Sequence, residues 1–538
     1  MKKALAIILA LLMVLGMLTA CGGGKEETPA DDSAAAGGAG DDIAEIGSGN
    51  SVVDENVDAN VDANETRVLN ISLADDCGTL NPMVSSGSFV SVTYAFYEPL
   101  WDYDSSGERI WILAESYEPV SEIQYTLKIR EGVKFSNGND FTAEDVLFTM
   151  QLCGADPRFY LNVKAIDFEK TKIIDDYTLD VWYTRYDVTQ ETNMLQMLIY
   201  DSDSYDPEVM STTTIGTGPY VVTDYVVNSH ITATRNENYW GEPAKIKTIN
   251  FKIIGEAAQI INAVETGDID IASGIDVSEV DYVTSLGYVI DKAWSGYCHT
   301  AYLSFNGALA SKEARWAVAY ACDRDAMNQV MFNGISTVSS YPASEHMIDY
   351  EERFDNLADY YATGYNLDKA KEYAEKSGLV GKTLKIITNG WEMYNNAALV
   401  WQQSLKQIGV ESEIVAMDQA TYFGTLMDAT LFDIGFYFAS SPCMLASDTM
   451  KNYPDFVPLA WTGEVRDEYG RVSTACVSTF DPAARAELLY ESIVMFADVC
   501  AWIPVVEAVA VRAWDSDIAN VTYNLAGNCN YQYITFVN

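Results

Sequence analysis

The feature that most constrains the fold is an order that recurs along the chain: a helical stripe of apolar residues, then a glycine, then a strand pattern. Residues 367–377 carry apolar residues on one helical face and are followed by Gly378. A second stripe, in residues 398–408, stops at Gly409, and strand alternation begins at once. Alternating strand patterns also occur at 125–129 and 249–253. Mixed helices and strands in this order predict α/β lobes rather than an all-helical or all-β body.

Size and charge narrow the possible functions. The chain has 538 residues, enough for several folding units and a large buried core. It carries 33 Lys and Arg against 78 Asp and Glu, a formal charge of −45. Such a charge repels phosphate backbones, so we expect no nucleic-acid partner. The hydrophobic fraction of 49% is too high for a disordered acidic chain. We expect a folded monomer.

The first twenty residues form a targeting segment. A positive start is followed by an apolar run from Ala4 to Leu18, shorter than the roughly 20 residues of a membrane-spanning helix. Leu18-Thr-Ala-Cys21 resembles a bacterial lipobox. We therefore predict a lipoprotein signal peptide over 1–20, lipidation of Cys21, and an extracytoplasmic protein anchored to the cell membrane. The alternative is an ordinary secretory signal that leaves Cys21 unmodified.

The next segment has the composition of a spacer. Residues 22–65 are rich in Gly, Ala, Asp and Asn, and they contain the repeats Val57-Asp-Ala-Asn60 and Val61-Asp-Ala-Asn64. Such a stretch cannot bury a core, and its negative charges repel one another. We predict a disordered acidic linker over 21–65 and a folded body from Thr66 onward.

Motifs for catalysis and metal binding are missing from the sequence. His230, His299 and His346 are isolated, and no HExxH pattern or nucleophile elbow occurs. Residues 216–219 lack the third glycine of a dinucleotide fingerprint, and residues 102–107 fit a polar hairpin turn better than a calcium loop. We expect no enzyme activity, no cofactor and no metal. Eight cysteines after Cys21 allow 105 complete disulfide pairings, which the sequence leaves open.

A series of motifs runs in order along almost the whole chain after residue 66. They are Leu80-Asn-Pro82, Phe96-Tyr-Glu-Pro-Leu100, Leu113-Ala-Glu-Ser116, Tyr125-Thr-Leu-Lys-Ile-Arg-Glu-Gly-Val-Lys-Phe135, Phe141-Thr-Ala-Glu-Asp-Val146, Gly216-Thr-Gly-Pro-Tyr220, Arg235-Asn-Glu-Asn-Tyr-Trp240, Glu265-Thr-Gly-Asp-Ile-Asp270, Phe305-Asn306, Arg315, Tyr320-Ala-Cys-Asp-Arg324, Asn366-Leu-Asp-Lys-Ala-Lys371 and Leu405-Lys-Gln-Ile-Gly-Val410. In this order they resemble the family 5 extracytoplasmic solute-binding proteins, the oligopeptide, dipeptide and nickel receptors of ABC importers.

The resemblance implies a bilobed, periplasmic-binding-protein-like type II α/β fold with a small extra subdomain. Lobe one would comprise about 66–296 and 505–538, with the subdomain at about 102–205, and lobe two about 297–504. The lobes of such receptors close around a solute, and the importer permease subunits recognise the closed form. No bond is made or broken, which agrees with the missing catalytic motifs.

The region expected to determine specificity departs from the peptide-binding pattern. Many peptide-binding relatives carry, after the strand that corresponds to 432–435, a tryptophan and then an aspartate that pairs with the amino terminus of the peptide. Residues 436–442 here contain no acid. Because a buried ammonium without a carboxylate loses several kcal/mol, a peptide would need another acid such as Glu507.

Three ligand classes follow in order of preference: peptides, then an oligosaccharide or another small solute, and far behind them nickel. Aromatic faces beside hydroxyl and amide groups suit a sugar ring and a peptide side chain equally well. Core packing is an equal alternative for Trp391 and Tyr394. A tethered hydrolase or a purely adhesive lipoprotein has less support. The candidate ligand-binding residues are Ser86, Ser88, Phe89, Asn389, Trp391, Tyr394, Tyr437, Ser440, Ser441 and Glu507.

Overall fold

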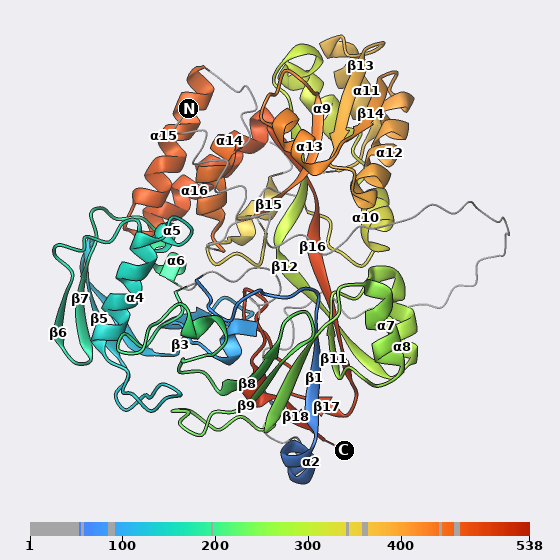
Figure 1. Ribbon diagram of the computed structural model, residues 1–538. Helices are drawn as coiled ribbons and strands as arrows, with labels where there is room; N and C mark the ends of the chain where they lie inside the picture. The colour runs from blue at the N-terminus through green and yellow to red at the C-terminus, as the bar shows by residue number, and fades with distance from the viewer. Residues whose placement is uncertain are drawn as a thin grey trace.

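A computed structural model describes residues 53–54, 57, 59–83, 92–194, 197–339, 344–357, 364–440, 444–456 and 463–537. The described chain forms two lobes, drawn one above the other in Figure 1. Two long antiparallel strands, β12 (Tyr288–Leu303) and β16 (Trp502–Asp515), run from one lobe into the other. The bilobed α/β architecture expected from the sequence is therefore present.

One continuous sheet passes through both lobes in the order β14-β13-β15-β12-β16-β11-β1-β10-β9-β8. In lobe one, β1 pairs in parallel with β10, from Val68 opposite Thr248 to Leu73 opposite Ile253. The strands of this half are β1 (Val68–Leu73), β8 (Tyr220–Val226), β9 (His230–Arg235), β10 (Thr248–Ile253) and β11 (Ile271–Ser273). Helices α7 (Ala257–Glu265) and α8 (Val280–Ser285) and the short strands β17 (Ile518–Ala519) and β18 (Thr535–Phe536) complete it.

A smaller unit projects from lobe one. Its four-stranded sheet has the order β4 (Ala114–Ser121), β5 (Gln124–Ile129), β7 (Thr178–Trp182) and β6 (Lys172–Asp175). Helices α4 (Ala143–Ala155), α5 (Tyr160–Val163) and α6 (Thr189–Asn193) accompany it, and the hairpin β2 (Trp101–Tyr103) and β3 (Arg109–Trp111) precedes it. Thr142 and Asp145 form the capping box that the sequence predicts at the start of α4. We call residues 114–194 the subdomain.

Lobe two contains the helix, glycine and strand order most clearly. Helix α11 (Leu367–Ser377) ends at Gly378, whose φ is +72°, and α12 (Glu392–Gln407) is followed by Gly409 and β14 (Glu411–Ala416). The other strands are β13 (Thr383–Thr388) and β15 (Ile434–Ser440). The remaining helices are α9 (Lys312–Tyr320), α10 (Arg324–Phe332), α13 (Gln419–Leu426), α14 (Ala446–Phe456), α15 (Glu464–Ser478) and α16 (Pro482–Val499).

The two connecting strands are irregular where they leave lobe one. Trp294 pairs with Val509 and Cys298 pairs with Glu507, so extra residues bulge from β12 between these pairs. Gly296 lies in this bulge with a φ of +88°. From Tyr297 onward, β12 also pairs with β15 of lobe two. We therefore propose that the lobes hinge at this bulge, close to the boundary expected at 296–297.

The expected end of the spacer at residue 65 is wrong. Helix α2 (Val61–Thr66) lies inside the expected linker, and the Asn60 side chain accepts a hydrogen bond from the amide of Ala63. Asn64 is buried, donates to Oγ1 of Thr535 (2.8 Å) and accepts from the amide of Phe536 (2.9 Å). Residues near the carboxyl end of the chain thus satisfy the hydrogen-bonding groups of the Asn64 side chain, although its sequence context is that of a spacer. In the described part of the chain, no helix combines the length and apolarity needed to cross a membrane.

Candidate functional site

Several buried polar atoms near the hinge have no hydrogen-bond partner. They include Oγ of Ser105, Nε1 of Trp294, Nε2 of His299, Oγ1 of Thr300 and Oε2 of Glu507, and other such atoms are scattered through the described chain, for example in Tyr97 and Gln190. Buried polar groups are nearly always paired, so a cluster of exceptions indicates a place where another molecule supplies the partners. Three of these residues lie on β12, and Glu507 lies on β16 directly opposite Cys298.

Glu507 is the most unusual of these groups. Burial raises the pKa of its carboxyl to about 7, against the lowering influence of Ser344, Trp294 and Ser339 nearby. The adjacent charge is another acid, Glu345, which raises the pKa further. Within the described ranges no lysine or arginine forms an ion pair with Glu507. The hinge therefore holds an acid whose charge no described lysine or arginine pairs with.

A narrow cavity lies beside the hinge. Ala293 and Trp294 of β12 line it together with Ser105, His346, Arg512, Tyr523, Asn524, Leu525 and Gly527. The rings of Trp294 and His346 stack at 5.3 Å, which joins β12 to the segment that starts at residue 344. The cavity offers about 20 Å³, room for roughly one water molecule. A larger solute could enter only if the lobes moved apart.

The positive charge at this cavity is already neutralised. Arg512 lies 3.5 Å from the carboxylate of Asp291, and both side chains are about nine-tenths buried. The Arg512 guanidinium also lies over the ring of Tyr523, 3.7 Å from its centroid, and donates to the carbonyl oxygen of Gly527 at 3.2 Å. These contacts fix the guanidinium on the protein. Glu507 is therefore the charged group of the hinge that a solute can complement.

The structure brings Trp391 and Tyr394 together in lobe two. Their rings are nearly parallel, with centroids 5.7 Å apart. Tyr394 is fully buried, and its hydroxyl oxygen lies 2.9 Å from Nδ1 of His299, whose pKa burial lowers to about 3. Trp391 is only partly buried. Of the two aromatic candidates, Trp391 thus retains a surface that a ligand can contact.

Two further candidates direct their side chains at the protein. Asn389 is buried; its Oδ1 accepts from the amide of Trp391 (3.2 Å) and its Nδ2 donates to Oε1 of Gln419 (3.3 Å). It shapes the turn at Gly390, where φ is +81°. Tyr437 is buried against Phe423 and Phe438, and burial raises its pKa. Both side chains are thus engaged with other groups of the protein.

The remaining candidates are described in part or not at all. Ser86, Ser88, Phe89 and Ser441 lie outside the described residues. Ser440 pairs with Tyr297 through the backbone at the end of β15, and its side chain is not described. Their role in ligand binding stays a prediction.

Sequence reasoning missed Trp294, Ser339 and Ser344 at the site, and it considered His346 only as a metal ligand. These residues lie in no shared motif. The register between β12 and β16 brings Trp294 to Glu507. Val338 forms a bridge with Val506 of β16, and the chain that follows it brings the two serines there. The local signal was a glutamate within the apolar run from residue 501 to residue 511, and the sequence analysis did single out Glu507.

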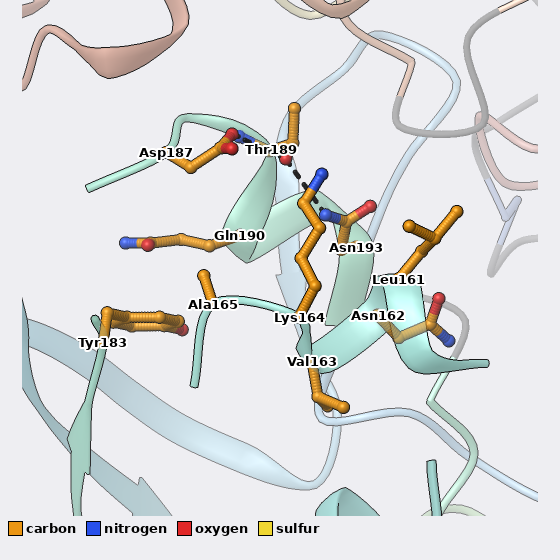
Figure 2. Close-up of a pocket in the computed structure, with 10 residues that line it drawn as sticks. All are labelled: Leu161, Asn162, Val163, Lys164, Ala165, Tyr183, Asp187, Thr189, Gln190 and Asn193. Atoms are coloured by element: carbon orange, nitrogen blue, oxygen red, sulfur yellow. Dashed lines mark hydrogen bonds between the residues drawn. The ribbon is translucent and has the colours of Figure 1, made fainter. Parts of the chain in front are cut away.

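A second hollow lies in the subdomain between α5 and α6. Figure 2 shows Asp187, Thr189 and Asn193 linked by hydrogen bonds along its upper rim, while Gln190 points away from Asn162. The hollow has no room for a water molecule. Its polar groups do not converge on a common point, so the site at the hinge is the better candidate. Elsewhere in the described chain, no three His, Cys, Asp or Glu side chains gather as metal ligands.

Comparison with known proteins gives the family. Residues 111–454 match the family model for bacterial extracellular solute-binding proteins, family 5. The chain is 26% identical over 369 residues to the glutathione-binding protein GsiB of Pectobacterium atrosepticum, covering 65% of this chain and 69% of the relative. It is 25% identical over 495 residues to the nickel-binding periplasmic protein of Escherichia coli, covering 83% and 90%.

The fold has solved counterparts. The structure of the ABC transporter substrate-binding protein CtaP from Listeria monocytogenes superimposes with a TM-score of 0.77 at 20% identity, covering 88% of this chain and 99% of CtaP. The type II fold inferred from the motifs is thereby confirmed. The match to the family model confirms the expectation of a binding protein rather than an enzyme. The chain belongs to the family 5 bacterial extracellular solute-binding proteins.

Proposed function

We propose that the protein captures peptides outside the cytoplasm by lobe closure and delivers them to the permease subunits of an ABC importer, while a lipid on Cys21 tethers it to the membrane. The observation that carries the peptide assignment is the buried, uncompensated carboxylate of Glu507 at the hinge. The similarity to a glutathione-binding protein supports it, because glutathione is a peptide with a free amine.

The ammonium group of a peptide is the natural partner of such an acid. Without a cation, an ionised carboxylate in this position pays a desolvation cost, and its pKa rises. An ammonium that enters beside Trp294 would pair with Oε2 and favour the ionised form. Glu507 would then replace the aspartate that is missing from residues 436–442. Ser339 and Ser344 lie close enough to orient the carboxylate.

An oligosaccharide or another small solute is the second candidate. The partly exposed ring of Trp391, held parallel to Tyr394, could stack on the apolar face of a sugar. This reading makes no use of Glu507. Peptide binding makes use of both groups and is preferred for that reason.

The test uses peptides with free and acetylated amino termini. Wild-type protein, Glu507→Gln and the control Glu372→Gln, which changes an exposed acid on α11, are titrated calorimetrically with both peptide sets. We expect acetylation and Glu507→Gln each to weaken binding at least tenfold, and Glu372→Gln to change it little. Native mass spectrometry of the purified protein identifies any solute that co-purifies. Equal affinity for acetylated peptides would remove Glu507 as the anchor, and a bound glycan would favour the second candidate.

A further inference from the structure

The lobes also touch at a second place, away from the hinge bulge, where lobe two meets the edge of the subdomain. The amide of Val188 donates to the carbonyl oxygen of Val477 (2.8 Å), and Nη1 of Arg485 donates to the hydroxyl oxygen of Tyr186 (3.0 Å). The rings of Tyr186 and Phe480 meet edge to face, with centroids 5.2 Å apart at 87°. We call these five residues the rim contact. Figure 1 shows α15 and α16 above α5 and α6 at this point.

Each side of the rim contact is held in place by its own lobe. On lobe two, Arg485 also donates to the carbonyl oxygens of Thr479 (3.0 Å) and Phe480 (3.2 Å), which fixes the turn between α15 and α16. On the subdomain, Asp187 accepts from the amide (3.1 Å) and hydroxyl (2.7 Å) of Thr189 at the start of α6. Both surfaces are therefore shaped before they meet, so little ordering entropy opposes their contact.

The rim contact does not include any residue that lines the hinge cavity. If the lobes open at the proposed hinge, these surfaces must separate, so the bonds would exist in the closed arrangement alone. An interaction made in one of two states shifts the equilibrium toward that state by its full free energy. A ligand that needs the closed lobes then binds more tightly, although the rim contact never touches it.

We infer that Tyr186, Phe480 and Arg485 stabilise the closed arrangement and so raise ligand affinity from outside the cleft. The inference rests on the lobe closure of the proposed function. It does not depend on what the ligand is, because the bonds form between protein groups only.

The experiment compares Phe480→Ala and Tyr186→Phe with the control Tyr160→Ala. Tyr160 is a half-exposed tyrosine of the same subdomain outside the rim contact. Hydrogen exchange of the Val188 amide and the radius of gyration from small-angle X-ray scattering report closure in the protein without added ligand. We expect Phe480→Ala to reduce protection of the Val188 amide about tenfold and to expand the molecule. Tyr186→Phe keeps the ring contact and should show a smaller loss, and Tyr160→Ala should match wild type.

Affinity is measured in parallel with a mixed library of dipeptides and tripeptides, with the bound fraction quantified by mass spectrometry. We expect the two rim variants to bind the library several-fold more weakly. The melting temperature of each full-length variant should stay close to that of wild type. Unchanged exchange and scattering in both variants would overturn the inference. If wild-type protein binds none of the library while the rim variants open, the peptide assignment fails and the rim contact stands.

Discussion

The hydroxyl oxygen of Tyr394 lies 2.9 Å from Nδ1 of His299 in the interior of lobe two. His299 belongs to the hinge strand β12, and Tyr394 belongs to the first turn of α12. Because burial lowers the pKa of His299 to about 3, the ring is neutral at physiological pH. Nδ1 can therefore accept a hydrogen bond from the tyrosine hydroxyl. The bond connects the aromatic pair of Trp391 and Tyr394 to β12, the strand at which we propose that the lobes hinge.

Tyr394→Phe should therefore lower stability. The substitution keeps the ring stack with Trp391 and removes the partner of a buried nitrogen, which costs about 1–3 kcal/mol. Urea denaturation of the two proteins measures the difference. Tyr373→Phe, at a partly buried position on α11, provides the comparison and should have a much smaller effect. Equal stability of Tyr394→Phe and wild type would show that the bond contributes nothing.

Trp391→Ala should weaken ligand binding at least several-fold. A stacking contact contributes about 0.5–1.5 kcal/mol beyond buried area, and the Trp391 ring is the partly exposed member of its stack. Titration calorimetry with the co-purified solute measures affinity, and thermal melting without it measures the fold. Because the ring also packs on Tyr394, we expect a modest fall in melting temperature. A large fall with unchanged affinity would make Trp391 a structural residue only.

Glu507 should make the unliganded protein more stable at mildly acidic pH than at neutral pH. Its pKa is about 7 in the folded protein against 4.5 ordinarily, so between these values the folded chain holds a proton that the unfolded chain has lost. Stability from this group therefore falls as pH rises through that window. Glu98, whose pKa burial also raises to about 7, acts in the same direction.

Melting temperatures of wild type and Glu507→Gln between pH 5 and 8 test this expectation. The uncharged amide should flatten the slope and stabilise the protein at pH 8 relative to wild type. Parallel curves for the two proteins would mean that Glu507 is not the source of the pH dependence. Binding of an amine ligand should show the opposite trend, because the ionised carboxylate is the binding form.

Asn64 should be required for full stability although it lies in a spacer-like repeat. Asn64→Ala removes the amide donor to Oγ1 of Thr535 and the side-chain acceptor of the buried Phe536 amide, at a cost of about 1–3 kcal/mol. Asn238→Ala, a change at a loop asparagine bonded to one carbonyl oxygen, serves as the matched control. A truncated chain that starts at residue 67 should likewise melt below one that starts at 53. Equal melting of the two truncated chains would contradict the docking of α2.

Cys21→Ala should release the protein from the membrane fraction. Leu18-Thr-Ala-Cys21 places small residues before the cysteine, as lipid modification requires. Cell fractionation with metabolic lipid labelling measures the change, and Cys77→Ala, at a buried cysteine of the folded body, should stay labelled. Membrane retention of an unlabelled Cys21→Ala variant would disprove the assignment.

Local patterns made much of the fold predictable. The capping box at Thr142 and the glycine after α11 act through neighbouring residues, so both could be read from the sequence. The environment of Glu507 could not be read in this way, because Trp294 and Ser344 lie more than 160 residues away along the chain. Strand register brings Trp294 to Glu507, and the segment after Val338 brings Ser344. The hydrogen bonds of Asn64 could not be predicted from the sequence for a related reason. Its partners lie at the other end of the chain, and its own composition is that of a spacer.

The attachment of α2 to β18 also determines which lobe would bear the force of a membrane tether. Asp54 accepts a hydrogen bond from Nδ2 of Asn520 (3.4 Å) and donates its amide to Oδ1 of the same residue (2.9 Å), so the chain is fastened to lobe one before α2 begins. If the proposed lipid on Cys21 tethers the protein, the pull therefore falls on lobe one and leaves lobe two free to move. At a membrane, lobe one would stay in place, and lobe two alone would move when a solute is captured or released.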